Sequence, residues 1–220
     1  MCIGYPINQV VCIPNHQIIQ RVVVVKIIVI ALGGLVGLWS GYTVLYEGRL
    51  ERPTYNVLQK DGKIEIRAYD SFRVAQTRRG EGREELSQGF RVVARYIFGG
   101  NEEQKSMSMT VPVIQENQSQ GMQVAFVMSE KEKDLPAPSS SAVQLKTIQW
   151  GHVASIHFSG YGTQKKFKKY EQRLRSWLNE NNQSIAGDAI YAQYNSPSAF
   201  PLLRKNEVLL RLTTEKKDDG

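Results

Sequence analysis

Few residues in this sequence are of types that carry out covalent or metal chemistry. The cysteines, Cys2 and Cys12, both lie in the first twelve residues, and the histidines are spread out as His16, His152 and His157. This spacing excludes a disulfide framework or a cysteine zinc site for the rest of the chain, and it disfavours a cluster of histidine ligands. Motifs such as G-x-S-x-G, H-E-x-x-H and a phosphate-binding glycine loop are missing from the sequence. We therefore expect neither an enzyme nor a metal site.

The methionines are the next candidates, because a thioether side chain is flexible and polarizable. Met107 and Met109 alternate along one expected strand, and Met122 and Met128 share one face of the next. Such side chains can contact an aromatic macrocycle, but they also fill irregular gaps in hydrophobic cores. Core filling is the default interpretation, and ligand contact is the alternative.

The densest positive charge lies in residues 165–175, KKFKKYEQRLR. Phe167 and Tyr170 fall on the inward stripe of an amphipathic helix, so a solvated basic face is the ordinary interpretation. Contact with anionic lipid headgroups is a second interpretation. Nucleic-acid binding is a third, but the basic surplus of the domain is too mild to favour it. We therefore expect no nucleic-acid partner.

A folded domain must position these residues, because 41% hydrophobic and 22% charged content excludes disorder as the main state. The hydrophobic period switches between two and 3.6, which predicts both strands and helices. Two successive units of strands, helix and strands indicate an α+β fold with an internal pseudo-repeat. Segment 130–141, charged and rich in serine and proline, is expected to be a surface linker. We expect helices over 86–97 and 167–177, and strands over 64–68, 72–77, 107–113, 122–128, 143–149, 152–158, 188–194 and 207–213.

An uncharged apolar run extends from Ile27 to Tyr46. At about 1.5 Å per residue it spans roughly 30 Å, the thickness of a bilayer core. We therefore expect an uncleaved transmembrane anchor over 25–46 that contacts lipid through 27–46, and Trp39 and Tyr42 suit an interfacial aromatic belt. The alternatives are a cleaved signal peptide, which usually has a shorter apolar region and a small-residue cleavage site, and a buried core helix.

The orientation of this anchor does not follow from charge counting. Arg21 and Lys26 precede the apolar run, but Arg49 and Arg52 follow it. The short leader, which has no acidic residue, resembles that of a bacterial signal anchor. It predicts a single-pass membrane protein with its domain on the non-cytoplasmic, periplasmic side.

Three glycines of the run, Gly33, Gly37 and Gly41, form overlapping G-x-x-x-G spacings. Such spacings let two membrane helices pack closely, so a homodimer is one interpretation. The general enrichment of glycine in membrane helices is the other.

The leader, residues 1–24, resembles neither the anchor nor the domain. Val22 to Val25 immediately precede Lys26 and the apolar run. We therefore hypothesise that translation starts at one of these valines through a GTG codon. In this interpretation the chain comprises a leader of doubtful authenticity, the anchor over 25–46, a domain over 53–213 and a flexible tail over 214–220.

Several strings together resemble the SOUL haem-binding protein family. They are PTYNVLQKDGKIEIRAYDSFRVAQT, GFRVVARYIFGGNE, KSMSMTVPV, FSGY and NSPSAFPLLRKNEVLL. The resemblance runs from about Pro53 to Leu212. Its specific part is M-x-M-T-x-P-V at Met107 to Val113, combined with N-E-V at 206–208 in the same order.

The resemblance implies a distorted antiparallel β-barrel flanked by two helices and built from two related halves. It also implies that haem or another tetrapyrrole binds in a shallow apolar groove, where basic groups meet the propionates. The helix that contacts the ligand in relatives corresponds to residues 87–95. There Phe90 and Ala94 occupy apolar contact positions, and Arg95 occupies the position of a basic propionate partner.

The sequence departs from the family at three ligand positions. The histidine that coordinates haem iron in one relative follows an E-I-R string and corresponds here to Ala68. A basic position upstream of N-E-V corresponds to Phe200, with Arg204 close by, and another at the helix start corresponds to Ser87. The expected site therefore comprises Phe90, Ala94, Arg95, Met107, Met109, Phe200 and Arg204.

We accordingly expect a membrane-tethered protein that binds haem or another tetrapyrrole without histidine coordination of the iron. The same duplicated architecture resembles DNA gyrase inhibitor-like effector-binding domains, so another amphipathic small molecule is the alternative ligand. A scaffold whose basic helix docks on lipid or protein is the third interpretation.

Overall fold

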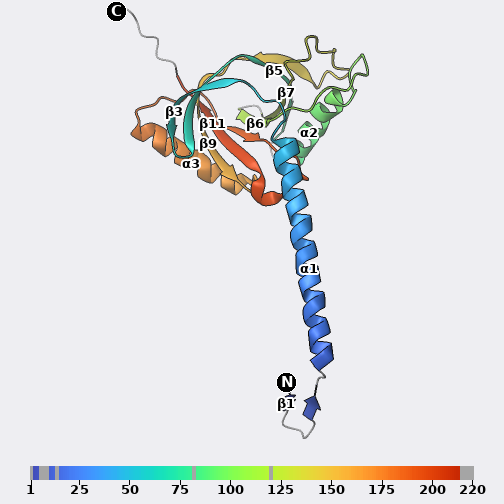
Figure 1. The fold of residues 1–220 in the computed structure, drawn as a ribbon. Helices are drawn as coiled ribbons and strands as arrows, with labels where there is room; N and C mark the ends of the chain where they lie inside the picture. The colour runs from blue at the N-terminus through green and yellow to red at the C-terminus, as the bar shows by residue number, and fades with distance from the viewer. Residues whose placement is uncertain (1, 5–9, 13–14, 81–82, 119–120, 214–220) are drawn as a thin grey trace, which may run out of the picture. The chain divides into compact units, whose positions relative to one another are not determined.

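The computed structural model describes residues 2–4, 10–12, 15–80, 83–118 and 121–213 (Figure 1). The chain forms two compact units, Met1–Tyr42 and Thr43–Gly220. The expected flexible tail over 214–220 lies outside the described residues.

The first unit contains the short paired strands β1 (Cys2–Gly4) and β2 (Val10–Cys12) and the helix α1 (Asn15–Tyr42). The helix continues as a π-helical turn, η1 (Thr43–Glu47), which belongs to the second unit. Among the described residues, one helix is long and apolar enough to cross a membrane: Gln20–Glu47, with a mean hydropathy of 2.5. The helix thus begins before the expected anchor and ends one residue after it.

The second unit is an α+β domain, as expected. Its sequence of elements is strands, helix and strands, repeated once. The elements are β3 (Tyr55–Asp61), β4 (Ile64–Tyr69), β5 (Phe72–Arg79), α2 (Arg83–Ile97), β6 (Val113–Gln118), β7 (Gly121–Val127), β8 (Gln144–Ile148), β9 (Gly151–Ser159), α3 (Gln164–Glu180), β10 (Ile190–Gln193), η2 (Pro201–Leu203) and β11 (Lys205–Arg211).

The strands form a nine-stranded sheet in the order β3-β4-β9-β11-β10-β6-β7-β5-β8, and every neighbouring pair is antiparallel. Each half contributes a strand, a helix and a hairpin: β5, α2 and β6-β7, then β9, α3 and β10-β11. The strand that precedes each half in the chain pairs with the other half. β4 precedes β5 but pairs with β9, and β8 precedes β9 but pairs with β5. This arrangement confirms the pseudo-repeat, and the curled sheet is a half-barrel with open edges at β3 and β8.

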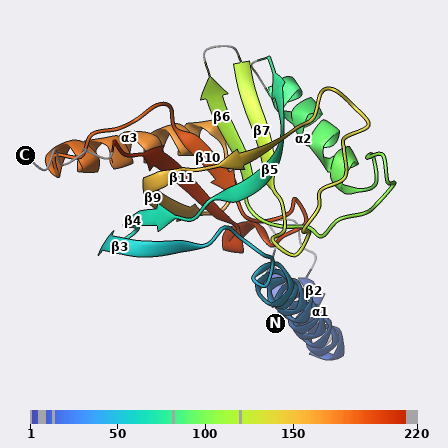
Figure 2. The same ribbon diagram turned by 90° about the horizontal axis from the view of Figure 1, so that it is seen from above.

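The two helices cover the outer face of the sheet. Figures 1 and 2 show α2 against β5 and β7, and α3 against β9 and β11. Under α3 lie Phe167, Leu174 and Leu178 with strand residues such as Ile156, and α2 covers a separate cluster that contains Val93. A third cluster fills the inner, concave face of the half-barrel. The periods of two and 3.6 therefore predicted which side chains are buried.

Local signals explain where the helices begin and end. The side chain of Thr163 accepts a hydrogen bond from the N–H of Lys166, so it caps α3. Glu84 and Glu85 in the first turn of α2 and Arg95 in its last turn match the helix dipole. Gly99, just after α2, has φ of +101°, a conformation that favours glycine.

The expected strand over 107–113 is wrong. The segment after α2 is held by side-chain and isolated backbone contacts, and the strand β6 begins only at Val113. Asn101 donates through Nδ2 to the carbonyl of Tyr96, and the N–H of Met107 donates to the carbonyl of Ile97. Pro112 has no N–H to donate to a strand ladder. Alternating apolar residues were therefore insufficient to form a strand here. The exposed edge strand β3 was not among the expected strands.

Inside the half-barrel, Arg67 of β4 and Glu207 of β11 form a bidentate ion pair. Nη1 and Nη2 of Arg67 lie 2.9 and 3.0 Å from the two carboxylate oxygens of Glu207, across 140 residues of sequence. Tyr194 donates its hydroxyl to the same carboxylate at 2.6 Å, and Nζ of Lys205 lies 2.9 Å from it. Arg67 also pairs with Glu65. Glu207 is fully buried, so these partners replace the water it loses on folding.

The partners of Glu207 determine its pKa. Burial alone would raise the pKa of this carboxyl, but the hydrogen bonds and charge of Arg67, with help from Lys205 and Tyr194, lower it to about 2. Burial raises the pKa of the Tyr194 hydroxyl, and the neighbouring Glu207 carboxylate raises it further. The pair is therefore ionised and Tyr194 neutral across the physiological range.

Replacement of Glu207 by glutamine is expected to destabilise the domain strongly. Glu207→Gln leaves the guanidinium of Arg67 buried with fewer partners, which typically costs about 3–5 kcal/mol. The measurement is the free energy of unfolding of the full chain in detergent solution. Lys60→Gln, which removes an exposed partner of Glu65, is the control and should leave the stability unchanged. Equal effects of the two variants would contradict a structural role for the pair.

The same carboxyl predicts a dependence of stability on pH. Because the pKa of Glu207 is lowered in the folded state, its contribution is present above the ordinary value of 4.5 and is lost as the pH falls towards about 2. This shift corresponds to about 3 kcal/mol. The difference in unfolding free energy between the native chain and Glu207→Gln should therefore shrink from pH 4.5 downward. A difference independent of pH in this window would refute the assignment.

Candidate functional site

The outward surface of α2 carries an apolar stripe. Phe90, Ala94 and Phe98 follow one another at intervals of four residues, so they lie on one side of the helix. The side chain of Phe90 is 37% exposed and that of Phe98 is 62% exposed. The ring of Phe90 also contacts Phe126 of β7, with centroids 5.0 Å apart. The stripe is therefore open to solvent and supported by the core beneath it.

Two arginines, Arg91 and Arg95, are exposed beside this stripe. Within the part of the chain that the structure describes, neither takes part in an ion pair. They border a hollow of about 440 Å³, which we call the α2 groove. Its lining residues are Arg91, Val92, Arg95, Tyr96, Gly100, Ser140 and Val143.

The segment expected as a linker forms the other wall of the α2 groove. Tyr96 donates its hydroxyl to the carbonyl of Pro136 at 2.9 Å, and Pro138 forms an isolated bridge with Asn101. Val143 is buried in the core cluster under α2. The chain from β7 to β8 is thus attached to the end of α2, so it shapes the groove.

The two methionines of M-x-M-T differ in environment. Met107 is buried, and it packs under α2 in the same cluster as Val93. Met109 is 40% exposed and lies outside any strand. Core filling therefore describes Met107. Met107 lies beneath α2, in the core. Phe90, Ala94 and Arg95 lie on α2 itself, at the surface.

Phe200 and Arg204 lie at the turn η2 rather than on α2. The N–H of Phe200 donates to Oγ1 of Thr43 at 2.9 Å. The guanidinium of Arg204 donates to the carbonyls of Ala199 and Pro197 and lies 4.7 Å from the ring centroid of Tyr161. The side chain of Arg204 therefore stabilises the loop before β11.

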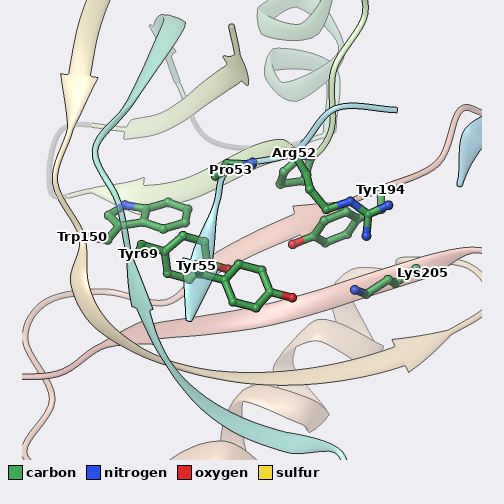
Figure 3. Close-up of a pocket in the computed structure, with 8 residues that line it drawn as sticks. Arg52, Pro53, Tyr55, Tyr69, Trp150, Tyr194 and Lys205 are labelled. Carbon is green, nitrogen blue, oxygen red and sulfur yellow. The ribbon is translucent and has the colours of Figure 1, made fainter. Parts of the chain in front are cut away.

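A second hollow, the inner pocket, opens on the concave face of the sheet (Figure 3). Its enclosed space is about 10 Å³, room for about one water molecule. The rings of Tyr55 and Tyr69 are 4.9 Å apart, and those of Tyr69 and Trp150 are 5.2 Å apart with an edge-to-face arrangement. Its lining residues are Arg52, Pro53, Tyr55, Tyr69, Pro112, Trp150, Tyr194 and Lys205.

The charge balance of the inner pocket is basic. Figure 3 shows Arg52 and Lys205 on the side of Tyr194, opposite Trp150 and Tyr69. The nearby carboxylate of Glu207 is already paired with Arg67, Lys205 and Tyr194. The pocket therefore combines aromatic walls with cationic groups at one side.

The histidines of β9 point to opposite faces, as their odd separation predicts. His157 is opposite Glu207 in the strand register and faces the interior of the half-barrel, and burial lowers the pKa of its imidazole. His152 is opposite Ala68 and faces outward, as do Ala154 and Ile156. Both histidines belong to the central part of the sheet.

Sequence reasoning missed several residues that define these surfaces. Arg91 lies four residues before Arg95, and Phe98 lies four residues after Ala94. This helical spacing was the signal in the sequence that could have added them to the expected ligand positions. Arg67 and Glu207 stand inside the E-I-R and N-E-V strings, but their pairing needs a contact between distant strands. The aromatic residues of the inner pocket come from four separate segments and had no local signal.

Comparison with known proteins agrees with this architecture. Heme-binding protein 1 of Mus musculus is 27% identical over 135 residues, which cover 58% of this chain and 71% of the mouse protein. The Xenopus laevis protein of the same name is 27% identical over 161 residues, 68% of this chain and 84% of the frog protein. The solved EcmrR C-terminal domain shares the fold, with a TM-score of 0.53 at 9% identity over 73% of this chain and 98% of that domain.

The profile of the SOUL heme-binding protein family matches residues 50–211. This match covers every strand and helix from β4 to β11 and the strings E-I-R, M-x-M-T-x-P-V and N-E-V. The chain therefore belongs to the SOUL heme-binding protein family.

Proposed function

We propose that this chain binds haem or another tetrapyrrole on the surface of α2, without histidine coordination of the iron, and that it is a binding protein rather than an enzyme. The observation that carries the proposal is the stripe of Phe90, Ala94 and Phe98 beside the exposed Arg91 and Arg95. Family membership and the names of the mouse and frog relatives support haem as the ligand.

The chemistry of α2 suits a tetrapyrrole. A porphyrin has a flat apolar ring and carboxylate side chains at one edge, so it needs an apolar surface next to hydrogen-bond donors. Phe90 and Phe98 offer the apolar surface, and guanidinium groups form strong, charge-assisted hydrogen bonds with carboxylates. The α2 groove, at about 440 Å³, gives the ligand edge a recess between Arg95 and Val143.

The positions of the histidines support binding without their coordination. His152 and His157 lie on β9, whereas the proposed surface lies on α2. Ala68 occupies the position that corresponds to the coordinating histidine of one relative, and methyl groups cannot ligate iron. The affinity would then come from the ring and the propionates, so metal-free porphyrin should bind about as well as haem.

We also propose that Gln20–Glu47 is a single-pass membrane anchor, with the domain outside the cytoplasm. The length and apolar composition of this helix support the anchor. The leader without acidic residues supports the orientation. Dimerisation through Gly33, Gly37 and Gly41 stays a prediction.

Loss of either arginine should weaken tetrapyrrole binding. Arg91→Ala and Arg95→Ala each remove a charge-assisted hydrogen bond at an exposed site, for which about 1.4 kcal/mol, or tenfold in Kd, is expected. The measurement is fluorescence quenching of the full chain in detergent by haem and by protoporphyrin. Arg173→Ala, an exposed arginine of α3, is the matched control. An unchanged Kd in both α2 variants would refute the site.

Removal of the histidines should leave haem binding intact. We expect His152→Ala and His157→Ala to retain the Soret band and the Kd of the native chain, because neither imidazole lies on α2. The measurement is a titration with ferric haem followed by absorption spectroscopy. If either variant loses a six-coordinate histidine spectrum that the native chain shows, that histidine coordinates the iron. Haem would then bind near β9 and not on α2.

A second candidate function is the binding of a small aromatic anion at the mouth of the inner pocket. The specific observation is the combination of Tyr55, Tyr69 and Trp150 with the cationic Arg52 and Lys205. A buried carboxylate suited to a cationic ligand exists there as Glu207, but Arg67 and Lys205 already neutralise it. The pocket therefore favours anions over cations.

Matched ligands of opposite charge test this candidate. Benzoate should bind more tightly than benzylammonium to the full chain, and Lys205→Ala should reduce this preference because it removes a cation from the pocket. Calorimetry gives the affinities, and the fluorescence of Trp150 reports occupancy of the pocket. Equal affinities for the two ligands, or no binding of either, would exclude the candidate.

A further inference from the structure

The last turn of the membrane-spanning helix is joined to the loop that precedes β11. Oγ1 of Thr43 accepts the N–H of Phe200 at 2.9 Å, and the carboxylate of Glu47 accepts Nδ2 of Asn195 at 2.7 Å and the hydroxyl of Ser196. Thr43 and Glu47 are both buried. The loop over 195–204 is therefore fixed against η1.

These contacts place the loop at the level of the helix end. Thr43 and Glu47 are the first and last residues of η1, where the apolar helix ends. If Glu47 lies at the surface of a bilayer, the backbone of Phe200, which is bonded to Thr43, lies near that surface. The residues that follow Phe200 are then close to the boundary between headgroups and acyl chains.

The residues that follow are apolar and exposed. Leu202 and Leu203, in the turn η2, are 72% and 42% exposed. On η1 itself Val44, Leu45 and Tyr46 are likewise exposed. Isolated exposed leucines are ordinary, but two adjacent ones fixed beside an exposed membrane-spanning turn form an apolar surface that continues the span.

The turn η2 is held in place by several bonds. Pro201 occupies its first turn, and the N–H of Leu203 donates to the carbonyl of Phe200 at 3.0 Å. Arg204 donates to the carbonyls of Pro197 and Ala199. These bonds fix the backbone that carries the two leucines. Little backbone conformational entropy is therefore lost when the leucines enter a bilayer.

The nearby charges suit a membrane surface. Arg49 and Arg52 follow the helix end directly, and Arg204 follows the leucines. Basic residues at this depth meet phosphate groups, and they add to binding when the lipids are anionic. The acidic residues beside these arginines are both hydrogen-bonded: Glu47 to Asn195 and Ser196, and Glu51 to Ser129 and the N–H of Glu130. Their carboxylates are therefore already occupied within the domain.

We infer that the turn η2 is a second membrane contact, at which Leu202 and Leu203 insert into the headgroup boundary of the bilayer that the helix crosses. The domain then contacts the membrane through η2 as well as through the end of the span. This inference rests on the proposed anchor but not on tetrapyrrole binding, which concerns α2.

The test places a fluorescent probe on each leucine of the full chain. In a background of Cys2→Ser and Cys12→Ser, the variants Leu202→Cys and Leu203→Cys are labelled with an environment-sensitive nitrobenzoxadiazole group. The chain is reconstituted into vesicles of phosphatidylcholine and phosphatidylglycerol. Leu58→Cys is the matched control, since Leu58 is an exposed leucine on the edge strand β3, 55% exposed.

We expect doxyl-labelled lipid, with its quencher near the headgroup, to remove most of the fluorescence at positions 202 and 203 and little at position 58. Aqueous iodide should give the reverse order. Iodide quenching at position 202 equal to that at position 58 would overturn the inference, as would a probe shielded from both quenchers, which indicates a protein partner such as a second copy.

Flotation of the same vesicles separates this inference from its premises. A chain that floats with the vesicles but exposes position 202 to iodide retains the anchor and loses the second contact. A chain that does not float overturns both. Titration of the labelled variants with haem measures tetrapyrrole binding separately. If haem does not bind, the quenching result at η2 still stands.

Discussion

The ion pair between Arg67 and Glu207 is the constraint on which the half-barrel depends. It joins β4 to β11, the last strand of the second half, inside the concave face of the sheet. A buried carboxylate is tolerated only with full partners, which Arg67, Lys205 and Tyr194 supply. Lys205 and Tyr194 also line the inner pocket. The interaction that joins the two halves therefore also determines the charge of the pocket.

The helices take no part in this inner network and cover the outer face instead. Each helix buries one stripe, and α2 leaves Phe90 and Phe98 partly uncovered beside Arg91 and Arg95. The fold thus separates two chemically distinct surfaces: an apolar and basic surface on α2, where we propose that a tetrapyrrole binds, and a small aromatic pocket inside the sheet.

The junction at Thr43 and Glu47 relates the domain to the helix that precedes it. A buried glutamate that accepts bonds from Asn195 and Ser196 makes the end of the span part of the domain's own structure. With the contact proposed at η2, the loop over 195–204 would also meet the membrane.

Periodicity and capping in the sequence alone determined the α+β class, both helices, most of the strands and the apolar span, because burial of one face leaves a local repeat of 3.6 or two. The ligand positions at Phe90, Ala94 and Arg95 came from resemblance to a family. Met107–Val113 alternates without forming a strand, because tertiary hydrogen bonds from Asn101 and the missing N–H of Pro112 outweigh the pattern. Tertiary structure alone decided the pairing of Arg67 with Glu207, the inner pocket with its aromatic residues from four segments, and the place of Phe200 beside Thr43. Each of these joins residues far apart in the chain, and such contacts leave no local pattern in the sequence.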